Sequence, residues 1–129
     1  MEKFHNLLSE LIFTSFCDSL TLQGESSVYF RLKNSCHSNP IEEVFRIYET
    51  DSSMILSDNG RTLANLDNIF ELNEPDVIRN IIAILKQFNI SKEGNAFTYK
   101  IDPSKDAIPQ IIHFLQGINF LYAMKLFYM

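Results

Sequence analysis

The sequence predicts an α+β domain in which a small, mainly antiparallel sheet packs against about three helices. Alternating apolar and polar residues, which are typical of strands, occur at 28–32, 44–48, 54–56 and 96–101. Apolar residues spaced three or four positions apart, which are typical of amphipathic helices, occur at 2–17, 75–88 and 105–124. The length of 129 residues suits a single domain that spans the chain, 1–129.

The first half of the chain alternates between these patterns and polar breaks. The helical stripe of 2–17 ends near Asp18 and Gly24, and the strand at 28–32 follows. Residues 34–40 are polar and turn-forming, so we expect a loop between this strand and the next one at 44–48. A third strand at 54–56 runs into the Asn-Gly pair of a turn.

Three features define the second half. A short helix is expected around 63–70, and Asn73 is expected to cap the helix at 75–88, with Pro75 in its first turn. Residues 91–95 contain Gly94 and are expected to form a turn before the strand at 96–101. A proline inside a helix costs about 3 kcal/mol, so Pro109 has to lie in the first turn of the last helix.

Composition and charge narrow the function classes. Hydrophobic residues make up 46% of the chain, which is enough to form a packed core. The net charge of −5 and the pI near 5.1 argue against a protein that grips the phosphate backbone of a nucleic acid. The apolar stretch 107–129 is interrupted by polar residues, which argues against a membrane span, and no signal peptide is recognisable. We therefore expect a cytoplasmic protein.

No catalytic, cofactor or metal site is predicted. Asp58 could act as a carboxylate base, but no histidine or second acid lies near it in the sequence, so the turn Asp58-Asn59-Gly60 is interpreted as structural. Cys36 and His37 are adjacent, whereas a zinc ion needs three or four ligands.

One segment resembles a known family. The run from Ile55 to Leu66, Ile-Leu-Ser-Asp-Asn-Gly-Arg-Thr-Leu-Ala-Asn-Leu, is similar to the signature of the bacterial and phage domain of unknown function 1828 family, in which a strand precedes an Asp-Asp/Asn-Gly turn. The resemblance extends more weakly over residues 18–124. It implies a setting on bacterial chromosomes, phages and mobile elements, and it implies no reaction.

Two groups of residues are candidates for binding a partner protein. One is an acidic cluster, for which a solvated surface is the simpler interpretation; it consists of Glu42, Glu43, Glu49 and Asp51. The other is a second apolar face of the last helix, which has to be covered either by the rest of the core or by another subunit, giving a homodimer through this helix; it consists of Phe114, Leu121, Met124 and Phe127.

The leading hypothesis is a non-enzymatic protein-interaction domain, in particular an accessory protein of a phage or mobile element that inhibits a bacterial defence protein in the manner of an anti-CRISPR. The alternative is a nucleic-acid-associated or toxin–antitoxin or restriction accessory regulator. That alternative needs a local basic patch, for which the candidates are Arg31, Lys33, Arg61 and Arg79. A hydrolase that uses Asp58 ranks third.

Overall fold

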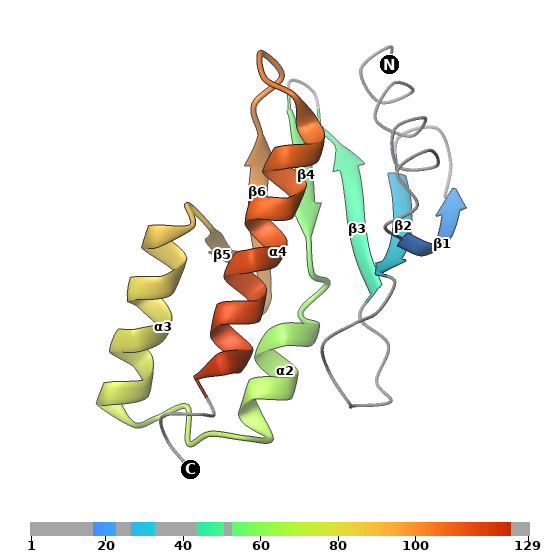
Figure 1. Cartoon of the computed structure of the whole chain (residues 1–129). Helices are drawn as coiled ribbons and strands as arrows, with labels where there is room; N and C mark the ends of the chain where they lie inside the picture. The colour runs from blue at the N-terminus through green and yellow to red at the C-terminus, as the bar shows by residue number, and fades with distance from the viewer. Residues whose placement is uncertain (1–16, 23–26, 33–43, 51–52, 125–129) are drawn as a thin grey trace.

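The computed structural model describes residues 17–22, 27–32, 44–50 and 53–124, and within them it shows a six-stranded antiparallel sheet and three helices (Figure 1). The strands are β1 (Cys17–Leu22), β2 (Ser27–Leu32), β3 (Val44–Glu49), β4 (Met54–Ser57), β5 (Ser91–Glu93) and β6 (Ala96–Ile101). The helices are α2 (Arg61–Asp67), α3 (Pro75–Gln87) and α4 (Ala107–Ala123). The predicted α+β class is confirmed.

The sheet has the strand order β1-β2-β3-β4-β6-β5, and every neighbouring pair is antiparallel. The first four strands follow one another as a meander. Helices α2 and α3 come between β4 and the β5–β6 hairpin, and β6 then pairs with β4. This topology brings the turn after β4 next to the start of β6, although about forty residues separate them in the chain.

The helices cover one face of the sheet. Ile47 pairs with Leu56, and Leu56 pairs with Tyr99, so these side chains share a face because residues directly opposite in a sheet point the same way. In Figure 1, α4 lies across the sheet in front of β4 and β6, with α2 and α3 beside it. The core forms between the two layers, and its fully covered side chains include Ile47, Leu56, Leu66, Phe97, Ile111 and Phe114.

Helix α4 approaches the end of α3 closely because it carries a glycine at the contact. A Cβ atom on Gly117 would lie 2.6 Å from Cδ1 of Ile90 and 2.9 Å from Cβ of Phe88. The ring of Phe88 is flanked on α4 by His113, at 5.0 Å between ring centroids, and by Phe120, at 5.2 Å. The absence of a side chain at Gly117 therefore makes room for the segment that leaves α3.

The structure corrects four sequence predictions. Residues 17–22 form strand β1, whereas the predicted helix reached 17 and a break followed. Residues 91–93 form strand β5, where a turn alone was expected; its residues are all exposed and polar, so no alternation marks it. The N-cap of α3 is Glu74 and not Asn73, and it caps without its side chain. The last helix begins at Ala107, two residues later than predicted, with Pro109 in its first turn as expected.

Two sequence predictions fall outside the described part. The helical stripe of 2–16 and the loop at 34–40 belong to residues that the structure does not describe.

Candidate functional site

The Asp58 carboxylate is buried, with 1% of the residue exposed, and it accepts three backbone hydrogen bonds. Its Oδ1 accepts from the N–H groups of Gly60 and Phe97, each at 2.9 Å, and its Oδ2 accepts from the N–H of Thr62 at 3.1 Å. Two of these donors, Gly60 and Thr62, lie at the start of α2. The first N–H groups of a helix have no partner within the helix, and Asp58 supplies one here. The third donor belongs to β6.

This geometry supports the structural interpretation of the Asp58 turn. Asn59 and Gly60 both have positive φ, 59° and 79°, a conformation that asparagine and glycine adopt most easily. The N–H of Asn59 donates to Oγ of Ser57 at 3.1 Å. Because both carboxylate oxygens of Asp58 already accept N–H donors and the group is shielded from solvent, the structure gives no support to Asp58 as a catalytic base.

A second buried polar side chain, Gln110, makes several hydrogen bonds at the other end of β6. Gln110, in the first turns of α4 and 8% exposed, accepts the N–H of Asp102 at 2.7 Å through Oε1. Its Nε2 donates to the carbonyl oxygens of Asp102 and Asp106, both at 3.0 Å. The side-chain amide thus pairs with the N–H and C=O of Asp102 as a neighbouring strand would, and it fixes the loop between β6 and α4.

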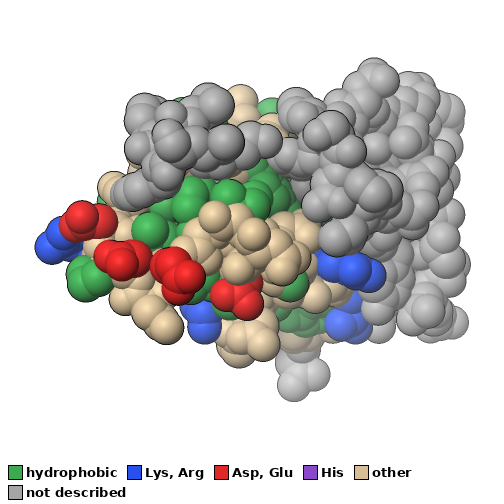
Figure 2. All heavy atoms as spheres, turned by 90° about the horizontal axis from the view of Figure 1, so that it is seen from below, with side chains coloured by type: hydrophobic (Ala, Val, Ile, Leu, Met, Phe, Trp, Pro, Cys, Tyr) green, Lys and Arg blue, Asp and Glu red, His purple; other side chains and the backbone are tan. Residues whose placement is uncertain are grey.

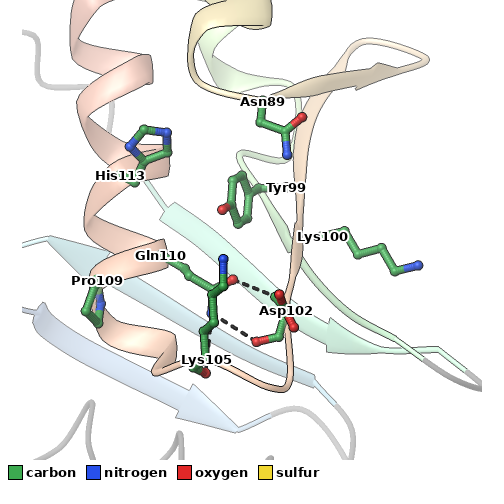
Figure 3. A pocket seen from close by; sticks show the side chains of 8 residues that line it. All are labelled: Asn89, Tyr99, Lys100, Asp102, Lys105, Pro109, Gln110 and His113. Atoms are coloured by element: carbon green, nitrogen blue, oxygen red, sulfur yellow. Dashed lines mark hydrogen bonds between the residues drawn. The ribbon is translucent and has the colours of Figure 1, made fainter.

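Beside Gln110 the surface is hollowed between β6 and α4 (Figure 3). The hollow encloses about 310 Å³, the lower end of the range for small-molecule sites. Its walls come from three parts of the chain, which are the exit of α3, strand β6 with the following loop, and the first turns of α4. The lining residues are Asn89, Tyr99, Lys100, Asp102, Lys105, Pro109, Gln110 and His113.

The polar groups of this hollow are not all used by the fold. Figure 3 shows Asn89, Tyr99 and His113 around one part of the hollow and Gln110, Asp102 and Lys105 around the other. The rings of Tyr99 and His113 meet edge to face, with centroids 6.4 Å apart. Within the described residues, the side-chain polar atoms of Asn89, Tyr99 and His113 make no hydrogen bond to the protein, whereas those of Asp102 and Gln110 do.

The predicted second apolar face of the last helix is part of the core. Phe114 and Leu121 are 0% exposed and Met124 is 3% exposed. The ring of Phe114 packs edge to face against Phe45 of β3 and Tyr99 of β6. Of the two alternatives, coverage by the rest of the core is correct for these three side chains, which are not available to a partner. Phe127 lies outside the described residues.

The predicted acidic cluster is described only at one position. Glu49 ends strand β3 and is partly buried, while Glu42, Glu43 and Asp51 lie outside the described residues. The acidic cluster therefore stays a prediction.

A different acidic stretch appears on the surface. The segment from the end of α2 to the start of α3 contains four exposed acidic residues and no lysine or arginine between Arg61 and Arg79; the acids are Asp67, Glu71, Glu74 and Asp76. Figure 2 views this end of the molecule and shows acidic side chains in a row beside exposed hydrophobic ones. We call this segment, residues 67–76, the acidic row.

Large apolar side chains are also exposed on the helical side. The most exposed in the described part of the chain are Ile69 at 44%, Ile78 at 41%, Ile82 at 45%, Ile112 at 45% and Phe120 at 52%. Ile69 lies within the acidic row, and Ile78 and Ile82 follow it one turn apart on α3. The helical layer thus presents apolar side chains next to negative charge.

Of the four residues that could form the basic patch of a nucleic-acid role, the structure describes the side chains of Arg61 and Arg79. Arg79 forms an ion pair with Asp76 on the same helix turn, and Arg61 is exposed at the start of α2. Lys33 and the side chain of Arg31 lie outside what is described. In the described ranges, no three His, Cys, Asp or Glu side chains come together as metal ligands, and no helix there has the length and apolarity needed to cross a bilayer.

The sequence does not predict the hollow, because its lining residues come from separate segments and form no motif. One signal was present. Gln110 lies one turn before Phe114 on the otherwise apolar buried stripe of α4, and a polar residue in such a position needs buried partners.

Comparisons with known proteins agree with the fold and name no activity. The model of the family described as "Domain of unknown function DUF1828" matches residues 36–120, which is more than half of the chain. No curated protein is significantly similar to the sequence. A crystal structure of an uncharacterized protein from Methanothermobacter thermautotrophicus is similar, with a TM-score of 0.54 at 9% identity, over 98% of this chain and 95% of that one. At this identity the likeness concerns the fold alone.

Proposed function

The chain belongs to the DUF1828 family, and from this premise we propose that it is a non-enzymatic protein-interaction domain that binds its partner through the helical layer. The observation that carries the proposal is that exposed isoleucines adjoin the acidic row: Ile69 lies within it, and Ile78 and Ile82 follow it on α3. Each of these isoleucines exposes more than two fifths of its surface to water.

The proposal specifies the chemistry of the partner. Exposed apolar side chains contribute to affinity when a partner removes them from water, and neighbouring charges set the rate and specificity of the encounter. Between Arg61 and Arg79 the chain supplies only negative charge. The complementary partner surface is therefore apolar with a border of lysine and arginine.

The more specific form of the proposal is that the partner is a bacterial defence protein that this chain inhibits. Small size, a net charge of −5 and the resemblance to a family expected on bacterial chromosomes, phages and mobile elements support it. An inhibitor of this kind works by occupying a surface of its target, for which a binding face suffices without a catalytic group.

The experiment combines a phenotype with a matched pair of variants. The chain is expressed in a bacterium with an active defence system, and the efficiency of plating of a phage that the system restricts is measured. We expect the wild type to restore plating and the double variant Ile78→Asp/Ile82→Asp to lose the effect. Lys92→Ala/Glu93→Ala, on the exposed strand β5, is the control that retains it.

The outcomes distinguish the defence-specific form of the proposal from its general form, which is binding of a protein partner through the helical layer. If no tested defence system is inhibited, the defence-specific form fails. The general form is tested by affinity capture from host lysate. A protein retained by the wild type and the β5 control, absent with the α3 variant and released by raising the salt concentration, supports it. Equal retention by the α3 variant contradicts the binding face.

A further inference from the structure

On the side of β6 that pairs with β5, Lys100 is an open position, because its backbone N–H and C=O groups have no partner among the described residues. In a strand, the backbone N–H and C=O groups of successive residues point to opposite neighbours. The Phe97 carbonyl accepts the N–H of Asp58 at 3.2 Å on the β4 side, so the backbone groups of residues 98, 100 and 102 face the other edge. At this edge Thr98 is paired with Ser91 of β5, and Asp102 is paired with the side chain of Gln110.

Nothing within the described chain fills the position between them. Strand β5 begins at Ser91, and Asn89, two residues before it, has φ 57°, so the chain turns away before it reaches Lys100. No hydrogen bond from the described residues reaches the outward N–H or C=O of Lys100. Lys100 is also one of the residues that line the hollow.

We propose that this open position binds the carboxamide group of a small aromatic molecule. The chain itself shows the required chemistry one ladder position away, where the Gln110 amide accepts the N–H of Asp102 and donates to its C=O. A carboxamide in the hollow makes the same two bonds with Lys100. Backbone donors and acceptors are normally paired, and a ligand that supplies both partners completes the edge.

The walls of the hollow favour a flat ring next to the carboxamide. Tyr99 and His113 present their rings from β6 and α4, and Pro109 adds an apolar surface. Aromatic rings pack well against such walls in offset or edge-to-face arrangements. The Lys100 side chain extends away from α4 in Figure 3, so its ammonium group is not part of the recognition.

Benzamide is the probe, and benzoate and benzyl alcohol are its matched controls. All three carry one benzene ring, but only benzamide supplies both an N–H donor and a C=O acceptor. Titration into the ¹⁵N-labelled full chain at 300 mM salt should give saturable shifts centred on the Lys100 amide. We expect benzoate and benzyl alcohol to bind roughly fivefold more weakly or worse. Benzoate has no donor, and benzyl alcohol offers a single oxygen atom where benzamide offers a separate N–H and C=O.

Two variants at one position separate the backbone from the side chain. Lys100→Pro removes the outward N–H, which proline can do at a sheet edge, and it should weaken benzamide binding roughly fivefold or more. Lys100→Ala keeps the N–H and should bind as the wild type does. If Lys100→Pro does not fold, nuclear Overhauser effects between benzamide and the rings of Tyr99 and His113 in the wild type give the second test.

The titrations either support or overturn binding of a carboxamide at Lys100. Equal binding of benzoate, shifts remote from the hollow, or no saturation at the solubility limit overturns the proposal. Given selective benzamide binding, a capped Phe-Asn dipeptide that binds more tightly than benzamide would show that the carboxamide belongs to a protein chain, and weaker binding would show that it belongs to a free small molecule. The inference does not depend on the acidic row.

Discussion

Oδ1 of Asp58 lies 2.9 Å from the backbone nitrogen of Phe97, although 39 positions separate the two residues in the sequence. The return bond, from the Asp58 N–H to the Phe97 carbonyl, measures 3.2 Å. Both residues are buried, and the same carboxylate also holds the first N–H groups of α2. One side chain therefore joins the end of β4, the start of α2 and the start of β6.

Replacing Asp58 should lower stability by several kcal/mol. Asp58→Ala leaves three backbone N–H groups without their acceptor, and hydrogen bonds to charged groups contribute about 1.5–3 kcal/mol each. Because losses within one cluster are not additive, we expect the free energy of unfolding to fall by about 3–5 kcal/mol. Urea denaturation followed by circular dichroism measures it.

Asp58→Asn and Asp67→Ala calibrate this result. The amide keeps one acceptor oxygen but places N–H₂ opposite a backbone donor, so a loss of about 2 kcal/mol is expected. Asp67 is exposed at the end of α2, and its removal should change stability by less than about 0.5 kcal/mol. A loss at Asp58 no larger than that at Asp67 would contradict the structural role.

Gly117→Ala should destabilise the domain although alanine favours helices. In a helix interior this exchange gains about 1 kcal/mol. Here the new methyl group would lie 2.6 Å from Ile90 Cδ1, and overpacking costs about 1–3 kcal/mol. We expect a net loss of up to about 2 kcal/mol in the free energy of unfolding, measured by thermal and urea denaturation.

A second substitution tests the cause of this loss. Ile90→Val removes the Cδ1 atom, so Gly117→Ala should cost less in the Ile90→Val background than in the wild type. The rescue should be partial because Phe88 Cβ and Cγ remain 2.9 Å from the new methyl position. An unchanged cost in both backgrounds would show that Ile90 is not the obstacle.

Asn65 and Tyr122 should be energetically coupled. Nδ2 of Asn65 donates to Oη of Tyr122 at 2.8 Å, and both residues are buried where α2 meets α4. A double-mutant cycle with Asn65→Ala and Tyr122→Phe should give a coupling of about 1 kcal/mol. The same cycle between Asn65→Ala and the exposed Gln116→Ala should give a value near zero, and a similar coupling in the two cycles would contradict the bond.

Gln110→Glu should make stability depend on pH. One oxygen of the introduced carboxyl group would face the carbonyls of Asp102 and Asp106, where Nε2 now donates. This repulsion disfavours the ionised form in the folded state, so the pKa of the new carboxyl rises above its unfolded value near 4.3. Relative to the wild type, stability is therefore retained below about pH 4 and falls as the pH rises above it.

The expected difference between pH 4 and pH 7 is about 1–3 kcal/mol, measured by urea denaturation at each pH. Gln116→Glu, exposed on the same helix, is the control and should show no comparable trend. An equal pH dependence in the two variants would contradict the role of Gln110 as a donor to the loop.

The sequence was informative wherever apolar periodicity was strong. The apolar stripe of helix α3 predicts burial of Val77, Ile81 and Leu85, which are buried, and also of Ile78 and Ile82, which are exposed. The predicted bounds of the helix agree with the observed ones to within a residue. Strand β5 was missed because Ser91, Lys92 and Glu93 are polar and exposed, and only their pairing with β6 makes them a strand. The buried state of Phe114 and Leu121 was one of two alternatives, since a helix apolar on two sides can be covered by its own core or by a partner.

The sequence by itself determined the α+β class, the positions of the main helices and strands, and the turn at Asp58-Asn59-Gly60, because these depend on local periodicity and on residues that tolerate positive φ. Only the tertiary structure decided that Asp58 meets Phe97, that Gly117 makes room for Ile90, and that Lys100 keeps an open ladder position beside Gln110. These relationships join segments far apart in the chain. Their geometry is set by strand order and helix packing, which no local pattern of residues encodes.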